Sequence, residues 1–124
     1  MAVVAFQDAT RSHLESMALQ PALSALRMVS HVRSAGIPLH ITSALRNPAA
    51  QAVLVATGRS KTLRSKHLTG QAFDVDVLGF ARAGVPRWWW YQLGALAEPL
   101  GLRWGGNFRG FWDPGHFEDA RSIK

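Results

Sequence analysis

Residues 65–78 read SKHLTGQAFDVDVL, and this stretch decides the fold. Its second half, Ala72–Leu78, alternates apolar and acidic side chains, which is typical of a β-strand with one buried face. Three apolar side chains would face the core: Phe73, Val75 and Val77. Asp74 and Asp76 would share the opposite face, where two carboxylates require solvent or a cation. The strand therefore carries two acids directly after a polar segment that contains His67.

Helical and strand patterns alternate along the rest of the chain without a regular βαβ rhythm. Helices are expected at Ser12–Gln20, at Pro21–Gly36, from Asn47-Pro48 to Gly58, and from Pro86 to Gly101. Further strands are expected at Ile37–Ala44, Leu102–Trp104 and Gly115–Glu118, and residues 58–70 are expected to form a loop. Four side chains of the second helix would face the core: Ala22, Leu26, Val29 and Val32. The pattern predicts an α+β fold in which one small domain, residues 1–124, packs a short antiparallel sheet against helices.

Composition restricts the possible classes of protein. The 124 residues are 48% hydrophobic and 18% charged, which is typical of a globular chain. With no cysteine, disulfides and thiolate metal sites are excluded. No apolar run approaches a membrane span, and the first residues do not form a signal peptide, so synthesis in the cytoplasm without an export signal is expected. The net charge of +6 favours an anionic partner, but no recognition-helix or RNA-binding motif accompanies it.

Two separated segments together contain the side chains of a catalytic metal site. His67 and Asp74 lie seven positions apart across the loop-to-strand transition, so their side chains can converge. The second segment, Asp113–Glu118, contributes His116 and places Asp113 three positions earlier across a Pro-Gly turn. Three protein ligands, an open position and a nearby base are what a catalytic zinc site requires.

Each of these residues also has a structural explanation when taken alone. The pair His67 and Asp74 fits a solvent-facing polar strip, and His116 fits a partly buried histidine with a satisfied hydrogen bond. Asp76 competes with Asp74 for the ligand role if the strand register differs. A site of two nitrogens and one oxygen also does not select one divalent metal strongly.

The combined motif narrows these alternatives. The pattern Ser65-x-His67-x-x-Gly70-x-Ala72-x-Asp74, followed by Trp104-Gly105-Gly106 and Asp113-x-x-His116-Phe117-Glu118, resembles the zinc peptidases of the D-Ala-D-Ala carboxypeptidase and VanY type, family M15. It is most similar to the L-alanyl-D-glutamate endopeptidases found as bacteriophage endolysins. The resemblance covers about residues 21–118, nearly the whole chain.

This resemblance implies roles for individual residues. It implies Zn²⁺ held by His67, Asp74 and His116 at the face of the sheet, with Asp113 as the general base. Upstream, Ser43-x-x-Arg46 with Gln51 matches the family segment in which the arginine contacts substrate and steadies the oxyanion. Ser65 would hydrogen-bond the substrate. The chain departs from the family after the Gly-Gly pair, where Asn107 and Phe108 replace an acidic residue and a tryptophan and where Trp112 directly precedes Asp113.

The expected function is zinc-dependent hydrolysis of the L-Ala–D-Glu bond in the stem peptide of peptidoglycan. One alternative is a D-Ala-D-Ala carboxypeptidase or dipeptidase, and another is a non-catalytic basic module that binds wall polymer or nucleic acid. A monomer is the default for so small an enzyme, and neither nucleic-acid binding nor membrane insertion is expected. Like a phage lysin, the protein would be made in the host cytoplasm and reach the wall through a separate pore. His13 and His31 are expected on exposed helix faces and His40 in a structural role. Within Trp88–Trp90, at least one ring is expected in the core and another beside the cleft.

Overall fold

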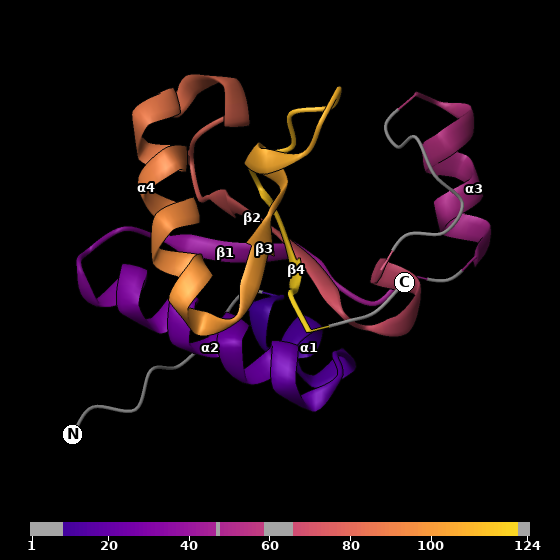
Figure 1. The fold of residues 1–124 in the computed structure, drawn as a ribbon, viewed down its shortest axis with the longest axis horizontal. Helices are drawn as coiled ribbons and strands as arrows, with labels where there is room; N and C mark the ends of the chain where they lie inside the picture. The colour runs from indigo at the N-terminus through magenta and orange to yellow at the C-terminus, as the bar shows by residue number, and fades with distance from the viewer. Residues whose placement is uncertain (1–8, 47, 59–65, 122–124) are drawn as a thin grey trace.

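A four-stranded antiparallel sheet lies at the centre of the fold (Figure 1). The computed structural model describes residues 9–46, 48–58 and 66–121. Its strands are β1 (Leu39–Ser43), β2 (Ala72–Val77), β3 (Leu102–Trp104) and β4 (His116–Asp119), in the order β1-β2-β4-β3. Its helices are α1 (Thr10–Ser16), α2 (Leu19–Ser34), α3 (Pro48–Ala56) and α4 (Arg87–Ala97). Short 3₁₀ turns are η1 (Lys66–Thr69), η2 (Arg82–Gly84), η3 (Glu98–Leu100) and η4 (Gly105–Asn107). The predicted α+β class is confirmed.

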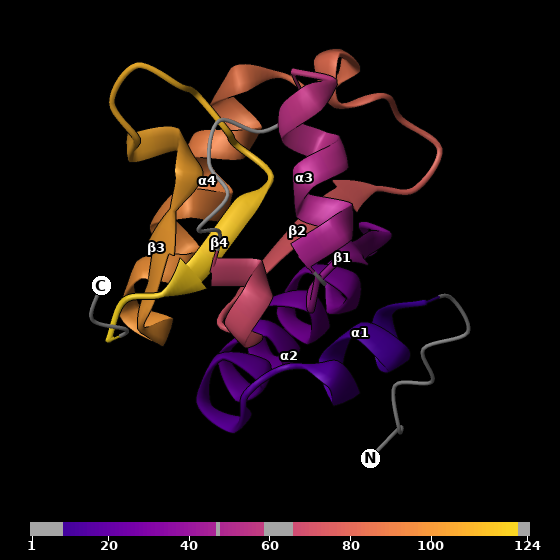
Figure 2. The same cartoon turned by 90° about the vertical axis from the view of Figure 1, so that its right-hand side faces the viewer.

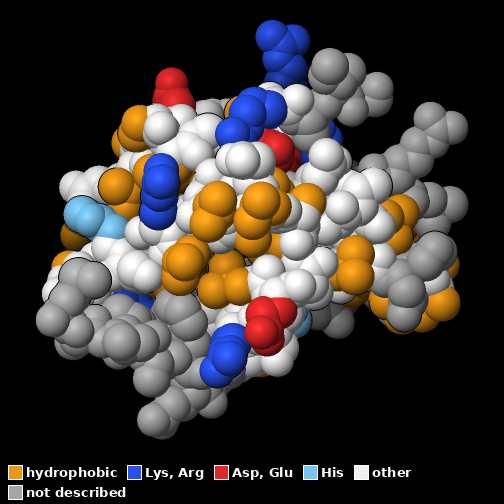
Figure 3. All heavy atoms as spheres, turned by 90° about the horizontal axis from the view of Figure 1, so that it is seen from below, with side chains coloured by type: hydrophobic (Ala, Val, Ile, Leu, Met, Phe, Trp, Pro, Cys, Tyr) orange, Lys and Arg blue, Asp and Glu red, His pale blue; other side chains and the backbone are white. Residues whose placement is uncertain are grey.

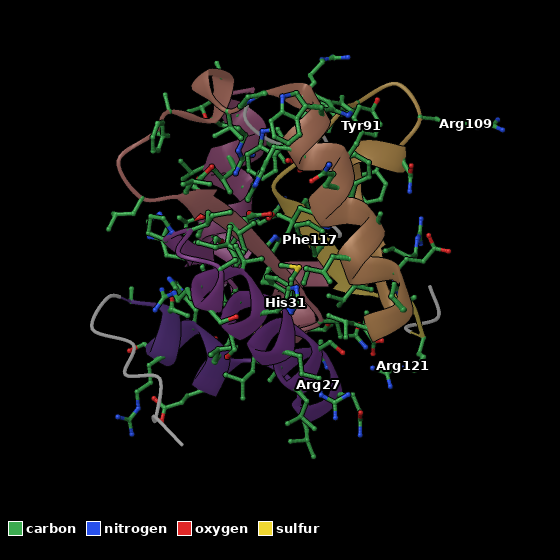
Figure 4. All side chains as sticks on the ribbon, turned by 90° about the vertical axis from the view of Figure 1, so that its left-hand side faces the viewer. Arg27, His31, Tyr91, Arg109, Phe117 and Arg121 are labelled. Carbon is green, nitrogen blue, oxygen red and sulfur yellow. The ribbon has the colours of Figure 1, made fainter. Side chains whose placement is uncertain are left out.

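The two faces of the sheet have different surroundings. Helices α1 and α2 lie beneath the sheet and α4 lies along one side, while α3 stands apart on the other side (Figure 1). The core forms between the sheet and α2 and α4, and its largest members include Phe73, Phe117, Trp90 and Met28. Figure 4 shows Phe117 in the interior between these helices. Alternation along β2 then directs Asp74 and Asp76 away from this core, as the sequence predicted.

Several element boundaries differ from the predicted ones. The two N-terminal helices separate at Met17-Ala18 rather than at Gln20-Pro21, because Ala18 is extended at φ −60° and ψ 150°. Its amide donates to the Gly70 carbonyl at 2.9 Å, so a tertiary contact fixes the break. Pro21 therefore lies inside the first turn of α2, where its missing amide proton costs no helical hydrogen bond. The predicted helix start at Asn47 lies outside the described residues.

The apolar stripe of α2 is also rotated relative to the prediction. Val29 and Val32 are buried and Ala22 packs against the core, but Leu26 is 38% exposed. The buried stripe instead passes through Ala25 and Met28, about one residue away around the helix. Leu26 joins exposed Leu19 and Leu23 on the outer surface of α2. Figure 3 shows apolar side chains gathered on this face of the molecule.

The remaining predicted histidines and tryptophans have mixed outcomes. His31 is exposed on α2 (Figure 4), whereas His13 is half-buried rather than exposed. Trp90 is buried in the core, Trp89 packs partly against it, and Trp88 is exposed. In the part of the chain that the structure describes, no helix has the length and apolar character needed to cross a membrane.

Candidate metal centre

The sheet register brings the two motif segments together. Asp74 on β2 and His116 on β4 are directly opposite each other in the antiparallel pair. Directly opposite side chains on one face of a sheet are close neighbours. The Asp74 Oδ1 atom accordingly lies 3.1 Å from His116 Nδ1.

His67 approaches the same carboxylate from η1, and Figure 2 shows this turn beside β2 and β4. The expected loop is therefore a 3₁₀ turn at this position. His67 Nε2 lies 3.3 Å from the second oxygen of Asp74, Oδ2. One potential ligand atom from each of His67, Asp74 and His116 lies within 4.8 Å of the others. The three residues predicted to hold the metal thus form one cluster in the structure.

Both histidine rings are oriented through the nitrogen that faces away from Asp74. His67 Nδ1 lies 2.6 Å from the Ala44 carbonyl oxygen, which can only accept, so we assign the proton to Nδ1. His116 Nε2 lies 2.9 Å from Glu118 Oε1, and its proton is assigned in the same way. His67 then offers the Nε2 lone pair and His116 the Nδ1 lone pair. This donor set of two imidazoles and one carboxylate, with outer hydrogen bonds in place, fits a divalent metal.

Contacts within the cluster shift the pKa values of His116, Asp74 and Glu118. Burial disfavours the charged form of His116, but hydrogen bonds to Asp74 and Glu118 raise its pKa from 6.5 to about 9. Burial would raise the pKa of Asp74, yet the close contacts with His116 and His67 lower it overall. The pKa of Glu118 is also lowered, because the contact with His116 and nearby cations outweighs burial. A proton on His116 therefore occupies part of the charge-balancing role of a cation.

Asp113 lies in the turn that leads into β4. Its backbone amide donates to the Gly105 carbonyl at 3.1 Å, and its own carbonyl accepts from the His116 amide at 3.2 Å. A side chain at Gly105 would collide with the Asp113 carbonyl oxygen, so the Gly-Gly pair permits a close approach within the chain itself. Burial and then the charge of Asp74 raise the pKa of Asp113, while His116, Arg82 and His67 partly offset this rise.

Arg46 contacts the cluster through Asp74. Its guanidinium donates to Gln51 Oε1 at 2.6 Å and to Ser43 Oγ at 2.9 Å, the two residues of its sequence motif. It also reaches Asp74 Oδ2 at 3.4 Å. The backbone amide of Arg46 donates to the His67 carbonyl at 2.9 Å, which ties the arginine segment to the histidine turn. The structure therefore places Arg46 beside the candidate metal ligands, while Ser65 lies outside the described residues.

Asp76 and the aromatic residues that depart from the family pattern have clear positions in the structure. Asp76 does not belong to the ligand cluster and instead pairs with Arg82 at 3.0 Å. The ring of Phe108 lies 5.4 Å from that of His116, so this residue supplies an aromatic wall beside the cluster. Trp112 contacts Arg87, whose guanidinium lies 4.3 Å from the ring centre.

Two further residues at the site, Glu118 and Arg82, have no role assigned in the sequence analysis. Glu118 is buried, and besides His116 it contacts Lys66 at 3.4 Å and Arg103 at 3.5 Å. Its position two residues after His116 on a strand was a usable signal, because such residues share a face. Arg82 reaches the site from η2, and no spacing rule connects it to Asp113.

Comparisons with known proteins identify the family to which the chain belongs. A family model described as D-alanyl-D-alanine carboxypeptidase, one of the M15 peptidase models, matches residues 58–119, which is half of the chain. The chain belongs to the M15 peptidase family. It is 34% identical over 101 residues to the L-alanyl-D-glutamate peptidase of Listeria phage A118. That alignment covers 77% of this chain but only 35% of the phage protein, so the chain spans about a third of that relative.

Solved structures share the fold. The L-Ala D-Glu endopeptidase ChiX of Serratia marcescens matches with a TM-score of 0.68 and 27% identity, covering 93% of this chain and 89% of ChiX. The vancomycin resistance D,D-pentapeptidase VanY, solved as a Zn(II) complex, matches with a TM-score of 0.62, covering 84% of this chain and 72% of VanY. At 15% identity, the VanY match supports the fold alone.

Proposed function

We propose that this M15 chain is a zinc-dependent peptidase that hydrolyses the L-Ala–D-Glu bond in the stem peptide of bacterial peptidoglycan. The observation that carries the proposal is the convergence of His67, Asp74 and His116, with the outward nitrogen of each ring already bonded to the protein. The choice of bond is supported by the phage relative at 34% identity and by ChiX at 27%, both described as cleaving at L-Ala and D-Glu. Like a phage lysin, the enzyme would be made in the host cytoplasm and would reach the wall through a separate pore.

We assign the metal to His67, Asp74 and His116. A zinc ion held there would supply a Lewis acid for the scissile carbonyl and an activated water. Imidazole and carboxylate ligands suit zinc, although their chemistry alone also admits other divalent ions. Metal binding at His116 would require loss of any proton on Nδ1, because a protonated ring has no lone pair there.

The other side chains act on the substrate and on the proton. Asp113 would accept a proton from the attacking water as the water oxygen bonds to the carbonyl carbon. It would then donate that proton to the leaving nitrogen as the C–N bond breaks. Arg46, whose guanidinium is oriented by Ser43 and Gln51, would bind the carbonyl oxygen as negative charge develops there. Ser65 is proposed to hydrogen-bond the substrate.

Digestion of purified muropeptides followed by mass spectrometry tests the scissile bond. We expect two products whose masses sum to the substrate plus one water, one of them a peptide with a new amino-terminal D-Glu. The Asp113→Asn variant should yield neither product, and Glu15→Gln, which removes an exposed carboxylate on α1, should cleave like the wild type. Release of free D-Ala without a new D-Glu terminus would contradict the endopeptidase assignment.

A D-Ala-D-Ala carboxypeptidase is the second candidate, because the matching family model carries that description. Both enzymes would use the same metal and base, so they differ in where the substrate carboxylate docks. Free D-Ala in the digestion would identify this activity directly. A protein that binds no zinc and cleaves neither bond would instead support a non-catalytic basic module that binds wall polymer or nucleic acid, for which the +6 charge is the supporting observation.

A further inference from the structure

Arg82 connects two carboxylates that come from different parts of the sheet. Its Nε atom donates to Asp76 Oδ1 at 3.0 Å and its Nη2 atom to Asp76 Oδ2 at 3.4 Å. Its Nη1 atom donates to Asp113 Oδ1 at 3.3 Å. The planar guanidinium therefore makes a bidentate interaction with Asp76 and a further hydrogen bond to Asp113.

The backbone around Arg82 is arranged to accept the guanidinium. Arg82 Nη2 also donates to the Val75 carbonyl of β2 at 3.4 Å. A Cβ atom at Gly115 would lie 2.5 Å from Nη2 and 2.7 Å from the Val75 carbonyl oxygen. Gly115 is hydrogen-bonded to the same strand, since its carbonyl accepts from the Val75 amide at 2.8 Å. Only a residue without a side chain leaves this space between β2 and the turn that carries Asp113.

We propose that Arg82 is a positioning residue, oriented by Asp76, that fixes the Asp113 carboxylate for proton transfer. This inference rests on the proposed function, in which Asp113 is the general base. With Oδ1 held by Arg82, the other oxygen, Oδ2, is the one that takes the proton from the attacking water and returns it to the leaving nitrogen. Displacing a catalytic group by about 1 Å can lower turnover about a hundredfold, so a fixed carboxylate matters for the rate.

The position of this pair also argues against a role in stability alone. The side chains of Arg82 and Asp113 are 37% and 25% exposed. Ion pairs of such exposure contribute little to folding free energy. Removal of Arg82 should therefore affect turnover far more than the urea midpoint of unfolding, which separates the two roles experimentally.

The test compares kcat and KM for muropeptide cleavage in Arg82→Ala, Asp76→Asn and the double variant, all loaded with zinc. Arg121→Ala is the matched control, because it removes another Arg–Asp pair, with Asp119 at 2.9 Å, at the end of β4 that is remote from Asp113. Figure 4 shows Arg121 and Arg109 in different parts of the molecule. Zinc affinity and the urea midpoint are measured for every variant.

For Arg82→Ala we expect kcat to fall about ten- to a hundredfold, with KM and zinc affinity changed less than about twofold. Asp76→Asn should lower kcat less, and the double variant should match Arg82→Ala, because Asp76 acts through Arg82. Arg82→Lys should recover part of kcat, since one ammonium can bond Asp113 without the fork to Asp76.

Three results would overturn the proposal. One is an unchanged kcat in Arg82→Ala, and another is a rise in KM alone, which would make Arg82 a substrate ligand. The third is a loss no larger than that of Arg121→Ala. If the wild type binds zinc but cleaves no muropeptide, the proposed function fails, and the positioning role fails with it. An active wild type with an equally active Arg82→Ala refutes the positioning role alone.

Discussion

The metal-free protein should lose stability as the pH rises from about 6.5 to about 9. In the folded state the contacts with Asp74 and Glu118 raise the pKa of His116 from 6.5 to about 9. A raised pKa means that the native state binds the proton more tightly than the unfolded state. The stabilisation is therefore fully present below about pH 6.5 and is lost as the pH rises through about 9.

The size of this effect follows from the two pKa values. One unit of pKa corresponds to about 1.4 kcal/mol, so the change from 6.5 to about 9 gives about 3–4 kcal/mol at most. This is a large part of the stability of a small domain, for which about 5–15 kcal/mol is usual. Urea unfolding of chelator-treated protein at intervals between pH 6 and pH 9 measures it directly. His31→Gln, which alters an exposed histidine on α2, should reproduce the wild-type curve.

Metal binding should have the opposite pH dependence and become stronger as the pH rises. The metal requires the Nδ1 lone pair of His116, so binding at pH 7 must release the proton held there. The apparent affinity should rise about tenfold per pH unit up to about pH 9, with about one proton released per metal at pH 7. Calorimetry in two buffers of different ionisation enthalpy counts that proton. A flat unfolding curve for the metal-free protein together with no proton release would refute the coupling of His116 to this cluster.

Two other predictions concern the outer hydrogen bond and the core. Glu118→Gln should weaken zinc binding about tenfold or more in a chelator competition, because the charged partner that orients the His116 ring is lost. Trp90→Ala should reduce the free energy of unfolding by about 3–5 kcal/mol, because the ring is buried in the core. Trp88→Ala, at an exposed position on the same helix, should change it by about 0.5 kcal/mol or less. Equal effects of the two tryptophan variants would contradict the packing of α4.

Local sequence rules could predict the strand that builds the site. Alternation in β2 identified which face carries Asp74, and a glycine or proline marked most element ends correctly. The break between α1 and α2 was misplaced, because no glycine or proline lies there and a hydrogen bond to Gly70 fixes it. Leu26 was assigned to the core because apolar spacing alone does not determine which side of an apolar helix meets the sheet.

In the site, too, local sequence spacing could predict some residues, whereas others depend on tertiary contacts. The two motif segments could be paired only through the family resemblance, since the β2–β4 register that sets Asp74 opposite His116 is a tertiary fact. The orienting role of Glu118 was accessible from its spacing to His116. The role of Arg82 was not accessible, because Arg82 and Asp113 are 31 positions apart in the sequence and only the folded chain brings them into contact.

Zinc content measured alongside muropeptide cleavage in Asp113→Ala tests the central claim most directly. In the proposed site, His67, Asp74 and His116 hold the metal and Asp113 only moves the proton. The variant should therefore retain about one zinc per chain and lose hydrolysis. Retained hydrolysis would contradict the role of Asp113 as the base, and loss of the zinc would show that Asp113 belongs to the metal ligands.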